Sequence, residues 1–442
     1  MIASALSPPQ SLEIPVIPNE PEWLSTARRA EFERFSEMGL PSVKEEDWRF
    51  TNVKAVADLS FHPAAPPAPE DLDAHIMQRS PFGDGDRLVF VNGHFFPKLS
   101  SIGRNGDGIK MMSLADALVR EPALVERHLF RSGRERATAF GSLNAALFQN
   151  GAFIHVPPGV SCAEPVHLLH LFTPHSSGEA AYPRNLIVVE RGSQLTVTES
   201  YFSTIDSKYL TDAVTELVVG DEASVELLKL QDESRESFHL ATLAVHAGRG
   251  SRVRLHSVAL GARLSRTNIH ATLAGEGAEC LLNGLYVVGG EQLADHYMIV
   301  DHAVPHGTSH EYFNGILDGK ARGVFHGRII VEPDAQKTDA KQTNKNLLLS
   351  EDATIDTKPQ LEIYADDVKC THGATVGQLS DEAIFYLRSR GIPREKARRM
   401  LIEAFAGEIV DRIADDGLRS ALSERVARHL KQNQPAERAG HV

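Results

Sequence analysis

Cys370 and His372 are the residues whose types and spacing point most directly to metal chemistry. They stand two positions apart in the segment DDVKCTHGATVG, residues 366–377, where a strand would turn both side chains to one face with Cα atoms about 7 Å apart. Thiolate and imidazole bind iron and zinc, but structural centres of these metals usually take about four protein ligands. The pair therefore predicts only part of a metal site, whose remaining ligands must come from elsewhere. The alternative is a small thiol and a ring that only pack at a strand end.

A second group of candidate ligands is a set of four histidines within fifteen residues. Its last two members have the i, i+4 spacing of a helical zinc pair, but a neighbouring proline and glycine disfavour a helix, and no H-E-x-x-H motif is present. We expect loop or core histidines that are hydrogen-bonded to the backbone, and we assign no metal to them. The set is His296, His302, His306 and His310.

Motifs of nucleotide and hydrolytic enzymes are incomplete or missing. In the segment NGILDGKARG, residues 314–323, only three residues separate Gly315 from Gly319, and Ala321 stands where a phosphate-binding loop needs serine or threonine. We therefore expect no NTPase activity. No G-x-S-x-G or dinucleotide motif occurs, and the many carboxylates neither indicate nor rule out an acid–base enzyme.

Composition narrows the class of protein. The chain has 442 residues and a formal net charge of -13, so we expect no nucleic-acid partner. Its three cysteines, Cys162, Cys280 and Cys370, are far apart and contain no C-x-x-C pair, which argues against a disulfide framework and favours a reducing compartment. The N-terminus lacks a basic region before an apolar run, and no stretch approaches the length of a membrane span. We expect a soluble, cytoplasmic protein without membrane contact.

The chain divides into three regions, which we predict as domains. Residues 1–150 mix helices and loops and are mostly helical; residues 21–39 space their apolar side chains at helical intervals and end at Gly39. Residues 151–376 are short apolar runs broken by glycine turns, and residues 377–442 are again helical.

The middle region repeats itself. The small residues Ser193, Ser224, Ser251 and Ala278 each follow a turn and lie 31, 27 and 27 positions apart, which is typical of a solenoid whose stacked coils share one core. Later intervals are expected to widen at loops such as residues 295–315. The repeat predicts a mainly β protein with a β-helix core, and a β-sandwich is the alternative.

The third region predicts helices that cap the solenoid. Ser380 is a suitable N-cap for residues 381–390, and further helices are predicted over residues 393–413 and 418–430. Because a solenoid end must be capped or paired, Cys370 and His372 fall near a predicted interface. The helices either cap alone or also dock another protein. The candidate docking residues are Phe385, Tyr386, Arg388 and Phe405.

Two long segments resemble the SufB/SufD family of iron–sulfur cluster assembly proteins. They are residues 313–392, which include VKCTHGAT, and residues 39–53, GLPSVKEEDWRFTNV; the resemblance is weakest over residues 60–150. The absence of cysteine from KPQLEIYADD, just before VKCTHGAT, favours the SufD branch over SufB. The resemblance implies a right-handed parallel β-helix flanked by helical regions.

The resemblance also implies partners and a role. It implies a non-enzymatic subunit that pairs with a SufB-like subunit and binds a SufC-like ABC-type ATPase through residues 380–418. Iron or a nascent cluster would be held transiently at the SufB interface, with His372 as the main ligand and Cys370 as the second, and this chain alone would bind no cofactor stably. The free edge would also allow a homodimer of the isolated chain. The competing class is a β-helix polysaccharide lyase or hydrolase; a self-sufficient metal scaffold is disfavoured by the number of cysteines.

Overall fold

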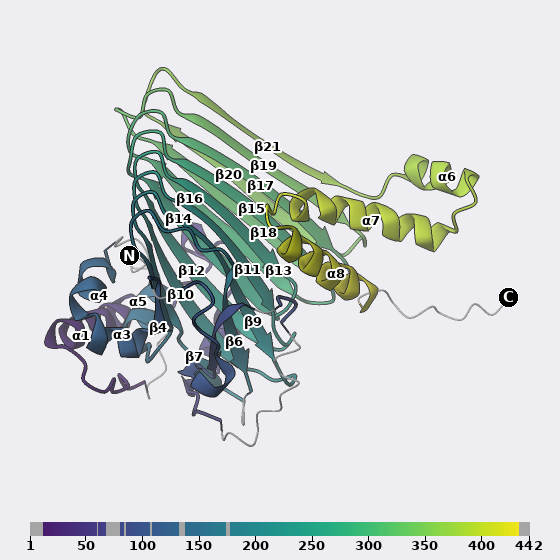
Figure 1. The fold of residues 1–442 in the computed structure, drawn as a ribbon. Coiled ribbons are helices and arrows are strands. Elements are labelled where there is room, and N and C mark those ends of the chain that lie inside the picture. Colours follow the sequence, from purple (N-terminus) through teal and green to yellow (C-terminus); the bar gives the residue numbers. More distant parts are fainter. Residues whose placement is uncertain are drawn as a thin grey trace.

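Two long sheets of mainly parallel strands form the body of the molecule, and successive strands of the chain alternate between them (Figure 1). Each coil of the chain adds one strand to each sheet, so the sheets grow together as a β-solenoid. The computed structural model describes residues 12–59, 61–67, 80–83, 85–106, 108–131, 138–173 and 177–432.

Within the described residues the first sheet has 11 strands and the second has 10. The first sheet contains β1 (His62–Pro63), β4 (Lys110–Ser113), β5 (Ala152–Val156), β7 (Glu179–Ala181), β8 (Arg184–Val189), β10 (Leu210–Val219), β12 (Phe238–Ala247), β14 (Leu264–Leu273), β16 (Leu293–His302), β18 (Arg322–Val331) and β20 (Thr354–Ile363). The second sheet contains β2 (Asp86–Val91), β3 (His94–Phe95), β6 (Val166–Phe172), β9 (Gln194–Ser203), β11 (Ser224–Asp232), β13 (Arg252–Ala259), β15 (Glu279–Val288), β17 (Thr308–Leu317), β19 (Asp339–Leu348) and β21 (Lys369–Gly377).

The helices precede and follow the long strands. Before them come α1 (Glu22–Met38), η1 (Glu46–Trp48), α2 (Lys54–Ala57), η4 (Pro97–Leu99), α3 (Leu114–Arg120), α4 (Pro122–His128) and α5 (Ala139–Leu147). After them come α6 (Asp381–Ser389), α7 (Arg394–Val410) and α8 (Asp416–Gln432). No helix within the described residues is long and apolar enough to cross a bilayer. The division of the chain into domains at residues 150 and 376 stays a prediction.

The solenoid confirms the predicted β-helix and excludes the β-sandwich, because the long strands of each sheet pair in parallel with the strand one coil away. Residues of one strand that face inward stack on their equivalents in the next coil. Leu195, Val225, Val253 and Cys280 form such a stack, and all four are buried in the core between the sheets.

The later intervals are slightly wider than the two of 27, but the loop expected at residues 295–315 is wrong. Residues 295–315 are not a loop; they are most of β16, a short turn and most of β17. The equivalent residues Glu279, Thr308, Asp339 and Lys369 lie 29, 31 and 30 positions apart, so the coil length stays nearly constant. Polar residues at inward positions had hidden the strand pattern of this segment.

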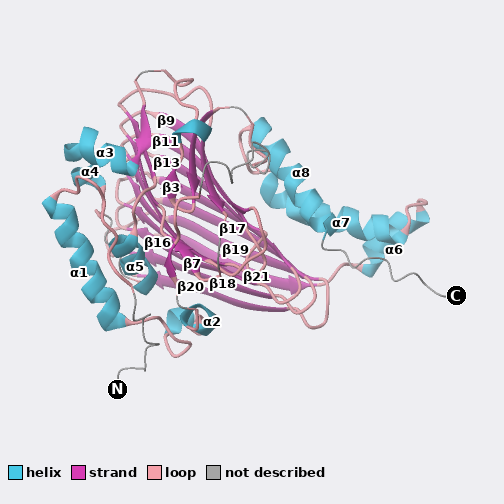
Figure 2. Cartoon of the chain, turned by 90° about the horizontal axis from the view of Figure 1, so that it is seen from below, coloured by secondary structure: helices cyan, strands magenta, loops and turns pink. Residues whose placement is uncertain are grey.

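The N-terminal helices cover the outer face of the first sheet. Leu24 and Phe35 of α1 share a core cluster with Leu210, Phe238 and Leu264, which begin successive strands of that sheet. On the other side of the solenoid α7 and α8 cover the second sheet, with Ile402 and Leu422 packed against β11, β13 and β15. Figure 2 shows the strands between these two groups of helices.

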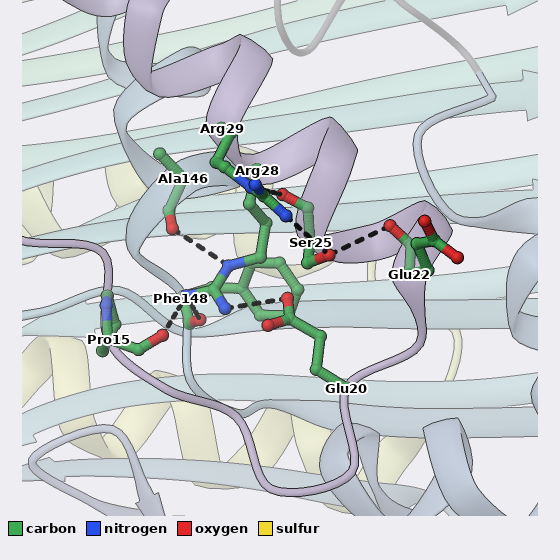
Figure 3. Close-up of polar contacts among 8 residues, drawn as sticks. All are labelled: Pro15, Glu20, Glu22, Ser25, Arg28, Arg29, Ala146 and Phe148. Carbon is green, nitrogen blue, oxygen red and sulfur yellow. Dashed lines mark hydrogen bonds and ion pairs between the residues drawn. The ribbon is translucent and has the colours of Figure 1, made fainter.

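Arg28 fastens α1 to the segment around α5, as Figure 3 shows. Its side chain is buried, and its guanidinium donates to the carbonyl of Ala146 at 3.0 Å and to that of Phe148 at 3.2 Å. It also donates to the carbonyl of Pro15 at 2.7 Å and pairs with Glu20 at 2.9 Å. Because a buried charge needs partners for its donors, this site fixes the approach of α1 to the solenoid.

Candidate functional site at the open end of the solenoid

The last coil ends in two strands that pair on one side only within the described residues. β20 pairs with β18, and β21 pairs with β19. Lys369 donates its backbone N–H to the carbonyl of Thr338 at 2.8 Å. Since N–H groups alternate in direction along a strand, those of Cys370, His372 and Ala374 face the unpaired edge. This edge is a ready template for a strand of another chain.

Cys370 and His372 lie on one side of β21, as their spacing predicted, and the structure shows that this is the inner side. They stand in register with Ala340 and Gln342 of β19, which are 0% and 1% exposed and face the interior. Cys370 is half-buried and packs against a small apolar cluster that contains Ala340, while His372 is exposed. The two side chains therefore stand over the interior of the solenoid where its last coil opens to solvent.

Burial raises the pKa of the Cys370 thiol; a hydrogen bond from the Ala340 backbone partly opposes this rise, and the nearby carboxylate of Asp339 adds a smaller increase. The other two cysteines are also perturbed, with the pKa of Cys162 raised to about 11 and that of Cys280 to about 12, both chiefly by burial. A thiol in this state is protonated at neutral pH. Metal binding at Cys370 therefore has to release a proton.

The strand edge presents two soft or borderline donors, with the carboxylate of Asp339 near Cys370. Within the described ranges, no group of three or more His, Cys, Asp or Glu side chains is placed to hold a metal ion. The four histidines named from the sequence are dispersed. His296 and His302 are buried on β16, His306 is in a turn at φ 63°, and His310 on β17 faces Asp339 at 3.4 Å.

The candidate docking residues divide into two groups. Phe385 and Tyr386 are 71% and 56% exposed on α6, and Arg388 of the same helix is exposed. Phe405 on α7 is half-buried against the solenoid, and its carbonyl accepts a hydrogen bond from Asn314 at 3.0 Å. Figure 1 shows α6 standing clear of the strands, beyond the end of α7.

Sequence reasoning missed a polar cluster inside the middle coils. Lys229 is buried, with its Nζ 2.7 Å from Nε2 of His239, whose Nδ1 is 2.6 Å from a carboxylate oxygen of Glu233. Burial lowers the pKa of Lys229 to about 8. The alternating run Val225, Leu227, Lys229 of β11 carries the signal, because it places this lysine on the same side as two core residues.

Comparison with known protein families assigns nearly the whole chain. Residues 172–405 match the family model described as SUF system FeS cluster assembly, SufBD core domain, and residues 16–168 match the SufBD protein N-terminal region.

Curated relatives resemble the chain over most of their own length. The iron–sulfur cluster assembly protein SufD of Escherichia coli is 34% identical over 89% of this chain and 90% of that protein. An iron–sulfur cluster assembly SufBD family protein of Synechocystis is 35% identical over 92% and 91%, and SufD of Bacillus subtilis is 28% identical over 93% and 95%. The solenoid with helices on both outer faces, and the match of both family models along it, show that this chain belongs to the SufBD family of iron–sulfur cluster assembly proteins.

Proposed function

We propose that this chain is a non-enzymatic subunit of an iron–sulfur cluster assembly complex, in which it pairs with a SufB-like subunit along the β20 and β21 edge. Iron or a nascent cluster binds at this subunit interface, with His372 as the main ligand and Cys370 as the second. The observation that carries the proposal is an incomplete donor pair on a strand edge that lacks a partner within the described residues.

The unpaired edge supports the choice of partner. Parallel strands of a second solenoid could continue both sheets. Main-chain hydrogen bonds can add a strand to an open edge whatever the side chains of that strand are. A related subunit has the matching strand spacing, and a second copy of this chain would have it too. The isolated chain is therefore expected to form homodimers when the SufB-like subunit is missing.

The donor chemistry suits cargo that must leave again. Thiolate favours iron–sulfur species, and imidazole replaces a thiolate on iron without adding negative charge. The raised pKa of Cys370 opposes ionisation of its thiol, which weakens it as a ligand relative to an ordinary cysteine. An interface to which this chain contributes one exposed imidazole and one thiol of raised pKa therefore binds iron or a cluster less tightly than four thiolates would.

The C-terminal helices supply the second proposed contact. α7 and α8 are occupied by their packing on the second sheet, whereas α6 offers two exposed aromatic side chains, Phe385 and Tyr386, next to Arg388. Aromatic and arginine side chains are enriched at protein interfaces. We assign α6 and the adjoining part of α7 to a SufC-like ATPase, and the three free cysteines fit work in the reducing cytoplasm.

The deciding experiment replaces His372 in cells where this chain, with its SufB-like and SufC-like partners, is the only assembly system. His372→Ala is expected to leave the complex intact on co-purification while the activity of an iron–sulfur reporter enzyme falls at least about tenfold, because one ligand at the interface is lost. His306→Ala, at an exposed turn, is the matched control and keeps wild-type activity. Undiminished maturation by His372→Ala would refute the proposal.

A further inference from the structure

Directly below His372 in the stack of coils stand two buried polar residues. Gln342 of β19 is in register with His372, and Glu311 of β17 is in register with Gln342. Neighbouring strands of a sheet lie about 4.8 Å apart, so the three inward-facing side chains form a column at the open end. Gln342 and Glu311 are 1% and 0% exposed.

One hydrogen bond joins the two buried members of this column, and each of them keeps one buried oxygen without a partner among the described residues. The Gln342 amide Nε2 donates to Oε2 of Glu311 at 2.6 Å. The amide oxygen of Gln342 is buried and has no hydrogen-bond partner among the described residues. A buried acceptor left unpaired destabilises the fold, which is a strong reason to expect a donor beside it. The next residue in the column, His372, carries such a donor in its ring.

The opposite sheet leaves space for this arrangement. A Cβ atom placed on Gly327 of β18 would lie 2.0 Å from Nε2 of Gln342 and 3.0 Å from Oε2 of Glu311. Any side chain at position 327 would therefore displace the amide from the carboxyl group. The absence of a side chain at Gly327 lets Gln342 lie flat within the interior, with its amide oriented by Glu311.

We propose that Gln342 is a positioning residue for His372. Its amide oxygen accepts the N–H of one ring nitrogen of His372, and the hydrogen bond from its Nε2 to Glu311 keeps that oxygen turned toward the ring. The other ring nitrogen is then left without a proton, as metal ligation by histidine requires. This inference rests on the proposed function of His372 and adds a residue that selects its tautomer.

The test reads the tautomer of His372 in the metal-free protein. The chain is labelled with ¹⁵N-histidine, the His372 ring signals are assigned by their loss in His372→Gln, and the shifts are recorded with the ring neutral. Wild type is expected to show one tautomer. Gln342→Met, which keeps the length of the side chain but removes the acceptor, is expected to show a mixture of both. Thr343→Val, on the same strand but the opposite face, is the control and keeps the wild-type shifts.

A double variant that exchanges the two residues controls for the loss of packing that Gln342→Met could cause. Glu311→Gln with Gln342→Glu exchanges donor and acceptor within the column, keeps its volume and again offers a buried oxygen to His372, so it is expected to restore one tautomer. In the assembled complex, Gln342→Met should weaken iron(II) binding about tenfold, the lower end for loss of a ligand-orienting hydrogen bond. Identical His372 ring shifts in wild type and Gln342→Met would overturn the inference. That result would leave the His372→Ala experiment to decide the proposed function independently.

Discussion

Cys370 combines a position at the proposed interface with a thiol that resists ionisation, and this contrast sets its reactivity. Burial raises the pKa of the thiol, and only the thiolate attacks an alkylating reagent. We expect iodoacetamide to modify Cys370 slowly at pH 7, with a rate that rises about tenfold per pH unit to above pH 9. Peptide mass spectrometry of the folded chain measures this rate for each cysteine.

The other cysteines provide internal controls for that measurement. Cys280 is 0% exposed with its pKa raised to about 12, so it should react only after unfolding. Cys162 is half-buried and its pKa is raised to about 11. Alkylation of Cys370 at pH 7 as fast as that of an unfolded peptide would contradict the assigned environment.

The sequence predicts the arrangement of Cys370 and His372 better than that of the two buried residues stacked below His372. That Cys370 and His372 share one side follows from their spacing, and the register of β21 confirms it. Gln342 and Glu311 could not be predicted as neighbours of His372, because only the length of each coil brings them into register. The loop expected at residues 295–315 includes Glu311, which the structure places on β17.

At the scale of single elements, the helices with clear end signals were predicted well. Ser380 accepts a hydrogen bond from the backbone N–H of Ala383, as expected for the N-cap of α6, and α1 ends before Gly39 at φ 66°. In the first region, the apolar run DRLVFVNGHFF from Asp86 indicates the strand β2, but not its place in the fold. β2 lies in the second sheet through parallel pairing with β6, some 80 residues later, and such a distant partner leaves no local signal.

α6 carries a prediction of its own, because Phe385 and Tyr386 are mostly exposed and the hydroxyl of Tyr386 accepts a hydrogen bond from Arg390, just beyond the end of the same helix. The double variant Phe385→Ser and Tyr386→Ser is expected to lower the affinity for a SufC-like ATPase at least tenfold, since buried aromatic anchors commonly contribute 2 kcal/mol or more to an interface. Co-purification from cells and titration of purified proteins measure the loss. Pairing with the SufB-like subunit should persist.

Two comparisons keep that test specific. Ile205→Ser removes another exposed apolar side chain, 50% exposed and distant in sequence from the C-terminal helices, and should bind the ATPase normally. Circular dichroism should show unchanged helix content in the double variant, because the side chains of Phe385 and Tyr386 are mostly exposed. Full ATPase binding by a folded double variant would remove α6 from the docking surface.

On the scale of the whole molecule, the two groups of helices leave the ends of the solenoid as the places where the stack of coils can continue. The outer face of the first sheet is covered by α1 and α5, and that of the second by α7 and α8. A partner that adds strands at β20 and β21 therefore meets the interior column as well as the backbone edge. This geometry joins the proposed pairing surface and the proposed ligands in one place.

The interior of the solenoid also determines how the molecule responds to acid. Burial lowers the pKa of His170 and His296 to about 3 and that of His167, His302 and His429 to about 4. In the unfolded chain these rings titrate near pH 6.5. Between pH 6.5 and the folded pKa values the unfolded state binds more protons, so stability is present above pH 6.5 and is lost as the pH falls.

His296 offers a clean way to test this linkage. It lies among Tyr286 and Phe313, with Oγ of Ser257 3.3 Å from its Nε2. The melting temperature of wild type is expected to fall steeply from pH 7 to pH 5 in scanning calorimetry. His296→Gln retains a hydrogen-bonding group but cannot take up a proton, so its free energy of unfolding should depend less on pH, by up to about 1.4 kcal/mol per pH unit below 6. An equal slope in the two proteins would mean that His296 is protonated within the folded solenoid, and that its interior admits charge where the contacts indicate that it does not.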